Sequence, residues 1–288
     1  MNDVNQSPLA AYKEEVAQYT KKDTNTALLY AIYLAMLALG TRFLAMEFGL
    51  RDIDGIWTFW QGQIINSFVF IPLFLVPAFV IVKKKGQGIG SLGLHLKDWK
   101  KALFVGILFF IVPLLLHDGL IPGLRGGWQM QSVAMLIWLL VYWGLMAFYE
   151  DVIFIGYIQT RIYGRIKGDR IAILAGAFIF AVVHWPSLVM ASALSGTGFG
   201  VSFLGELAMY TAMWMILYSV LNLIFRELRS LIPVTLFHAG VNLAVAGVLW
   251  QSAYEGGLSA PLSYGIIIGV VLVVTGFLER QKKRGKLA

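Results

Sequence analysis

The sequence contains no cysteine, which excludes disulfide bonds and thiolate chemistry. It is also poor in charge, because charged residues make up 14% of the chain and about 25% of a typical soluble domain. Two common hydrolase patterns, the GxSxG serine motif and the HExxH zinc motif, are absent as well. The chain instead has long apolar runs, with 58% hydrophobic residues and a mean hydropathy of +0.73. We therefore expect a polytopic membrane protein.

The apolar runs predict an all-α protein with about eight transmembrane helices. Each run has roughly 20 residues, which is enough to cross a hydrocarbon core of about 30 Å. The predicted spans lie near residues 27–46, 64–82, 101–117, 132–160, 171–190, 203–225, 231–250 and 260–278.

The basic residues predict the orientation of these spans. With both termini in the cytoplasm, 20 of the 23 Lys and Arg residues fall on the inner side, and only Arg42, Arg51 and Arg125 fall outside. The net charge of +7 is therefore explained by the orientation of the spans in the membrane and by attraction to anionic lipid. We expect no nucleic-acid partner.

The chain reads as one membrane domain with two polar ends. We expect a polar cytoplasmic segment at 1–26, the membrane domain at 27–278 and a basic cytoplasmic tail at 279–288. The short loops favour a prokaryotic plasma membrane, and the lipid bilayer is the expected partner. The small-xxx-small pattern at 265–269 is too common to predict an oligomeric state.

Few polar residues lie inside the predicted spans, and four of them lie at a similar depth. With a rise of 1.5 Å per residue, Glu150 lies roughly 16 Å, His184 roughly 21 Å and His238 roughly 13 Å from the nearest inner basic residue of its own span. Asn242 follows His238 by four residues and shares its helix face. Ionisable residues in a bilayer predict a functional site, so we expect these side chains to converge.

Each of these residues also has a plainer structural interpretation. A single His or Asn in a span more often forms a hydrogen bond between helices than it serves as a catalytic group. Asp151 is rotated about 100° from Glu150 on the helix, and we expect it to pair with Arg161 or Arg165 and hold the helix end in place. Only the conjunction of Glu150, His184, His238 and Asn242 favours catalysis.

Two hydrolytic schemes fit this set of residues. Glu150 can act as a general base on water, with an imidazole and an amide stabilising an oxyanion. Alternatively, Glu150, His184 and His238 can hold a divalent metal such as zinc, whose fourth position is a water. We favour the metal-free scheme, because Asn242 would be a poor fourth ligand.

Three ordered motifs resemble the CPBP family (CAAX protease and bacteriocin processing, or Abi) of intramembrane proteases. That family has EExxxR, FxxxH and HxxxN/D on separate helices, and its common run-on "GYLQTRL" is matched here by "GYIQTRI" at 156–162. The corresponding residues here, within about 130–250, are Glu150-Asp151, Phe180 to His184, and His238 to Asn242.

The resemblance implies an intramembrane endopeptidase. By that resemblance Glu150 activates water with help from His184, while His238 and Asn242 form the oxyanion pocket. Asp151, Phe154, Phe180 and Arg161 are expected to support the site. The substrates would be membrane-associated or prenylated peptides, cleaved near the cytoplasmic side.

Two departures from the motif keep a rival hypothesis open. Asp151 stands where the family has a second Glu, and Ile155 stands where it has Arg. A weak or inactive relative, acting in bacteriocin immunity or in binding, is therefore an alternative. A proton-coupled transporter is a third reading, but no internal repeat supports it.

Overall fold

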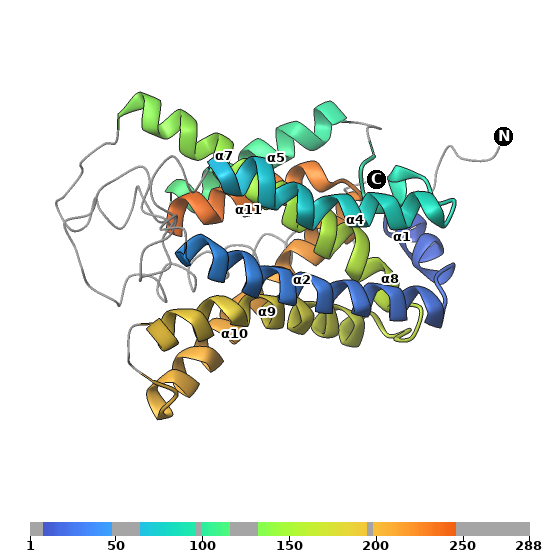
Figure 1. Cartoon of the computed structure of the whole chain (residues 1–288). Helices are drawn as coiled ribbons and strands as arrows, with labels where there is room; N and C mark the ends of the chain where they lie inside the picture. Colours follow the sequence, from blue (N-terminus) through green and yellow to red (C-terminus); the bar gives the residue numbers. More distant parts are fainter. Residues whose placement is uncertain (1–7, 48–63, 96–98, 116–131, 195–197, 246–288) are drawn as a thin grey trace.

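The computed structural model describes residues 8–47, 64–95, 99–115, 132–194 and 198–245 of the chain. Every regular element in this part is helical, which confirms the all-α class (Figure 1). Five helical stretches are long and apolar enough to cross a membrane: Lys21–Leu44, Ser67–Lys84, Val133–Ile162, Asp169–Met190 and Val201–Leu228. The chain is thus a polytopic membrane protein.

The predicted count of eight spans remains a prediction. The third and seventh predicted spans correspond to α5 (Trp99–Leu114), with 16 residues, and α11 (Leu231–Val245), with 15 residues. Both are shorter than the roughly 20 residues that a perpendicular helix needs. The eighth predicted span, 260–278, lies outside the described residues.

The N-terminal part folds onto the bundle. Helix α1 (Pro8–Ala17) packs against α10 (Val201–Leu228), where Tyr12 makes edge-on contacts with Tyr163 and Phe225. Helix α2 (Lys21–Glu47) begins earlier than the predicted 27, because Thr20 and Asp23 bond to each other's backbone amides and cap its first turn.

The longest rod in the bundle changes its helical register part-way. Helix α7 (Val133–Asp151) runs into a π-helix, η4 (Val152–Gln159), and then into α8 (Thr160–Ile162). Side chains bond to carbonyl groups of the π segment: the Tyr218 hydroxyl donates to Phe154, and Thr160 and Arg161 both donate to Gly156. In a membrane protein such partners stabilise an irregular backbone.

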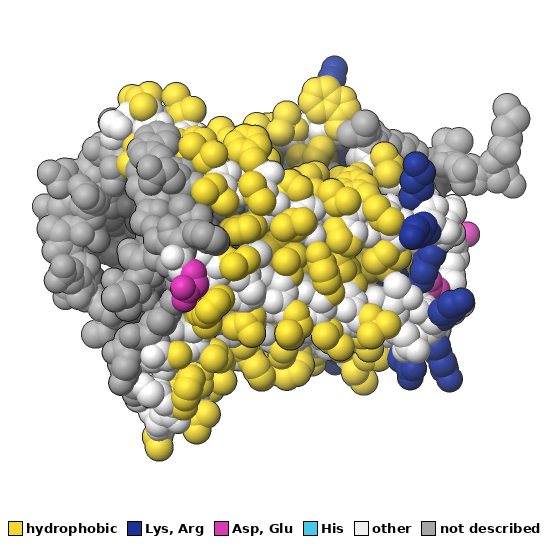
Figure 2. Space-filling view, viewed as in Figure 1, with side chains coloured by type: hydrophobic (Ala, Val, Ile, Leu, Met, Phe, Trp, Pro, Cys, Tyr) yellow, Lys and Arg dark blue, Asp and Glu magenta, His cyan; other side chains and the backbone are white. Residues whose placement is uncertain are grey.

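The remaining helices surround this rod. They are the π-helix η1 (Asn66–Phe70) with α4 (Ile71–Lys84), the short 3-10 helix η2 (Ile89–Leu92), and α9 (Asp169–Leu194). The core is apolar and aromatic, with Tyr157, Tyr218, Phe180, Phe225 and Phe237 all buried. Figure 2 shows a broad apolar belt on the outside, which suits contact with lipid.

Candidate active site

Three helices bring the predicted catalytic side chains together. Glu150 lies in the last turn of α7, His184 in α9 and His238 in α11. One carboxylate oxygen of Glu150 lies 3.7 Å from Nε2 of His184, and the other lies 3.6 Å from Nε2 of His238. Glu150 therefore lies between the two imidazoles. Its side chain keeps 12% of its surface exposed and that of His184 keeps 20%, so water can reach this end of the site.

Aromatic side chains and one carbonyl fix the position of His184. Its Nδ1 lies 2.8 Å from the carbonyl oxygen of Phe180, one turn earlier on α9. The His184 ring packs 4.3 Å from the Phe180 ring and 5.0 Å from the Trp214 ring. Phe154 packs edge-on against Phe180 at 5.0 Å. Phe154 and Phe180 thus pack beside His184, and their supporting role in the site stays a prediction.

Asp151 has a different partner from the predicted one. Its Oδ1 lies 3.0 Å from Nδ1 of His238, and the two residues are 1% and 2% exposed. The expected pairing with Arg161 or Arg165 is wrong, because Asp151 faces the neighbouring helix α11. Arg165 instead donates to Asn25.

Arg161 is likewise turned away from the acids. Its guanidinium donates to Gln87 and to the backbone and hydroxyl oxygens of Ser91. It lies 4.5 Å from the ring centres of both Tyr19 and Tyr157. Arg161 therefore holds the segment at 87–92 against the rod rather than supporting Glu150 directly.

Asn242 lies one turn beyond His238 on α11 and is half-buried. Its place in the helix keeps it on the same face as His238. Its predicted role in an oxyanion pocket stays a prediction.

Three contacts of the site were missed by the sequence reasoning. The Tyr149 hydroxyl lies 3.3 Å from Glu150 Oε1, and Trp214 and Tyr218 of α10 pack around His184 and Phe180. A signal existed for the second pair, because Tyr210, Trp214 and Tyr218 recur every four residues and form one aromatic face.

The comparison with known families agrees with this geometry. Residues 132–244, which contain all of the side chains that meet at Glu150, match the model of the family described as type II CAAX prenyl endopeptidase Rce1-like. The chain contains an Rce1-like domain. A search among curated proteins gave no match.

Residues 132–244 thus resemble a family of membrane proteases. The match confirms the resemblance to the CAAX proteases and supports peptidase activity in an integral membrane protein. The individual roles of Glu150, His184, His238 and Asn242 are a separate question.

The possible metal ligands in the described part of the Rce1-like domain can be compared with the predicted metal site. Within the described residues, no group of three or more His, Cys, Asp or Glu side chains is arranged to hold a metal ion. The alternative in which Glu150, His184 and His238 hold a divalent metal such as zinc stays a prediction.

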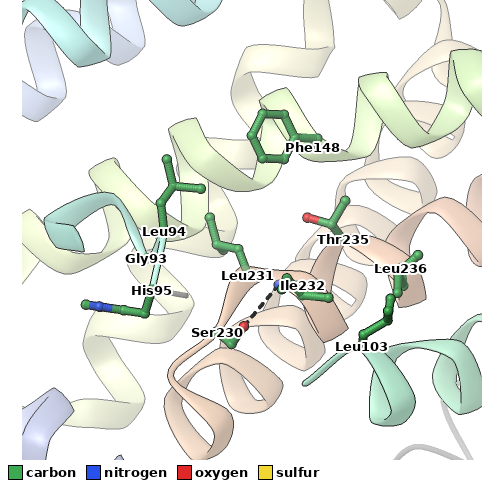
Figure 3. A pocket seen from close by; sticks show the side chains of 10 residues that line it. All are labelled: Gly93, Leu94, His95, Leu103, Phe148, Ser230, Leu231, Ile232, Thr235 and Leu236. Atoms are coloured by element: carbon green, nitrogen blue, oxygen red, sulfur yellow. Dashed lines mark hydrogen bonds between the residues drawn. The ribbon is translucent and has the colours of Figure 1, made fainter. Parts of the chain in front are cut away.

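An apolar cleft of about 270 Å³ is lined by residues 93–95 and by residues of α5, α7 and α11, with Ser230 just before α11 (Figure 3). Phe148 precedes Asp151 by three residues and Thr235 precedes His238 by three, so each lies one turn from a member of the buried Asp151–His238 pair. The other lining residues are Gly93, Leu94, His95, Leu103, Ser230, Leu231, Ile232 and Leu236.

Charged groups lie at the rim of the cleft. His95 Nε2 lies 3.4 Å from the Arg229 guanidinium, and Arg229 also forms an ion pair with Glu15 of α1. Burial, together with the nearby Arg229 cation, lowers the pKa of His95. His95 is therefore neutral at pH 7 and adds no second positive charge beside Arg229.

Proposed function

We propose that the chain is an intramembrane endopeptidase in which Glu150 activates a water molecule. The observation that carries this proposal is the position of the Glu150 carboxylate between Nε2 of His184 and Nε2 of His238, at 3.7 and 3.6 Å. A carboxylate held in this way between helices in a membrane is costly, so a functional role is its best explanation.

The reaction is a general-base hydrolysis. Glu150 takes a proton from water with help from His184, and the hydroxide attacks the carbonyl carbon of the peptide bond. Nε2–H of His238 and the Asn242 amide donate to the oxyanion that forms. When the tetrahedral intermediate collapses, the C–N bond breaks and Glu150 returns the proton to the leaving amine.

The substrate we propose is a membrane-associated or lipidated peptide. The cleft supports this choice, since it is lined mostly by leucine and other apolar side chains, and two of its lining residues, Phe148 and Thr235, lie one turn from Asp151 and His238. Apolar clefts with a few polar groups at one end are typical of binding sites. We further propose cleavage near the cytoplasmic side, in a prokaryotic plasma membrane.

The first test compares Glu150→Gln, His184→Ala and His238→Ala with wild type in a peptide-release assay. Glu150→Gln is expected to lower kcat by about 100-fold or more, because the general base is lost. Each His variant is expected to lose about 10–1,000-fold. The matched control is Glu206→Gln, since Glu206 is an exposed acid in α10 and should keep wild-type activity.

A strong chelator is added in parallel and should leave wild-type activity unchanged. Loss of activity that returns with added zinc would overturn the metal-free scheme. If all three variants fold and keep the cellular phenotype of wild type, the pocket only binds. That outcome would favour the immunity or binding alternative, for which buried Ile155 at the motif's Arg position is the specific observation.

A further inference from the structure

The pair formed by Asp151 and His238 is the most deeply buried polar pair beside the site. Oδ1 of Asp151 lies 3.0 Å from Nδ1 of His238, with 1% and 2% of the two side chains exposed. The other oxygen, Oδ2, is buried and has no hydrogen-bond partner in the described part of the chain. The Thr235 hydroxyl of α11 is a further polar neighbour of Asp151, and His238 is the side chain with which the carboxylate forms its hydrogen bond.

The local sequence accounts for this pairing. Ile155 follows Asp151 by four residues, at the position where the resembled family has an arginine, and it is completely buried. Within the described residues, the ion pair recorded for Asp151 is the one with His238. A buried acid needs a partner, because an unpaired charge in the interior costs several kcal/mol.

We propose that Asp151 is a positioning residue that orients His238 and keeps Nε2 of its ring a hydrogen-bond donor. This inference rests on the proposed function, in which Nε2 of His238 stabilises the oxyanion. It assigns to Asp151 a role that acts through His238 alone, without contact to the substrate.

The chemistry follows from the two nitrogens of one ring. If the shared proton lies on the imidazole, Nδ1–H donates to Asp151 and Nε2 also carries a proton. If the proton lies on Asp151, the carboxyl donates to Nδ1, and the neutral ring carries its proton on Nε2. In both cases Nε2 carries a proton and lies 3.6 Å from Glu150, where the proposed reaction places the carbonyl under attack.

Without Asp151 this orientation is lost. The neutral ring can then carry its proton on Nδ1 and present a lone pair at Nε2, which repels both the Glu150 carboxylate and the oxyanion. Carboxylates that orient an imidazole in other sites change activity or affinity by about 10–100-fold. The chain's own residues thus supply both the oxyanion donor and the group that aims it.

The kinetic test uses the full chain and a double-variant cycle. Asp151→Ala is expected to lower kcat by about 10–100-fold while KM changes by less than about twofold, because the oxyanion bond forms only in the transition state. In a His238→Ala background, the further change Asp151→Ala should alter kcat by less than about twofold. Independent losses that multiply in the double variant would overturn the proposal.

A measurement that does not need activity tests the pairing itself. The chain has 4 histidines, so ¹⁵N-histidine labelling gives few resonances, and that of His238 is the one missing in His238→Gln. Its Nδ1 resonance should shift in Asp151→Ala and stay unchanged in Glu206→Gln. An unchanged resonance in folded Asp151→Ala would overturn the pairing.

The two readouts separate this inference from the proposed function. A wild-type chain that releases no peptide overturns the proposed function, and the resonance then still decides whether Asp151 holds His238. Elution of each variant as a single species in detergent shows that folding is preserved.

Discussion

At the scale of single residues, Arg161 is a buried cation whose hydrogen bonds, among the described residues, go to neutral oxygens. It is 1% exposed, and its guanidinium donates to oxygens of Gln87, Ser91, Gly156 and Thr160. The rings of Tyr19 and Tyr157 lie 4.5 Å from it, close enough for cation–π attraction. Arg161 therefore joins the rod to the segment that begins the cleft.

The change Arg161→Lys is expected to destabilise the protein by about 2 kcal/mol, since an ammonium cannot reproduce the planar fork of donors and leaves buried oxygens unpaired. Thermal unfolding in detergent, followed by tryptophan fluorescence, measures the effect. Arg165→Lys is the matched control, because Arg165 is exposed and its contact with Asn25 is at the surface. Equal shifts for the two variants would contradict this account.

The site could be predicted from the sequence only in part. The similar depth of Glu150, His184 and His238 in their predicted spans was enough to predict that they meet, and the structure brings them together. The partner of Asp151 could not be found in this way, because it lies on a different helix and 87 residues away. Sequence spacing reports neighbours along one helix, and says little about which side chain of another helix faces them.

At the scale of elements, the rod formed by α7, η4 and α8 carries both Glu150, the proposed general base, and Arg161. Gly156, in the π segment of the rod, packs directly on the backbone of Leu92, so that a Cβ atom there would collide with the Leu92 carbonyl. This close contact sets the distance between the rod and the segment at 87–95.

Gly156→Ala is therefore expected to destabilise the protein by about 1–3 kcal/mol through overpacking, and to lower peptide release as the rod shifts. Gly144→Ala provides an internal control on the same rod, because a Cβ at Gly144 meets nothing within 4 Å. Unfolding midpoints and activity of both variants give the comparison. A Gly156→Ala protein as stable as Gly144→Ala would show that the contact is dispensable.

Long apolar runs were sufficient to predict the principal helices, but the π segment was not foreseen. The stretch "VIFIGYIQ" has the composition of an ordinary buried helix. Its register depends on partners elsewhere, such as the Tyr218 hydroxyl that bonds to the Phe154 carbonyl. For the same reason Arg161, which was expected to pair with Asp151, faces Gln87 and Ser91 instead.

At the scale of the whole molecule, charge and apolar surface are separated. Figure 2 shows Lys and Arg side chains gathered at the end of the bundle where α1 and α8 lie, beside the apolar belt. The start of α9 and the end of α10 meet at this end, where Arg226 lies 3.4 Å from Asp169. Helix α10, with 28 residues, begins about 40 Å away at the opposite end.

The positive-inside rule predicts that the basic end faces the cytoplasm. Because the chain has no cysteine, Lys167→Cys and Ser202→Cys each introduce a single exposed thiol, one at either end. A membrane-impermeant maleimide should label Ser202→Cys in intact cells, and Lys167→Cys only after permeabilisation. The reverse pattern would invert the topology and place the cleft on the outer side.

The three side chains at the centre of the site come from three separate helices, α7, α9 and α11. Their meeting point exists only while these helices stay associated laterally in the bilayer. The rate of peptide release that remains after heating, or after transfer into a harsher detergent, is therefore proportional to the fraction of molecules whose helices are still assembled. Peptide release would therefore report whether these three helices are still packed together, whereas a spectrum of helix content would not distinguish packed from separated helices.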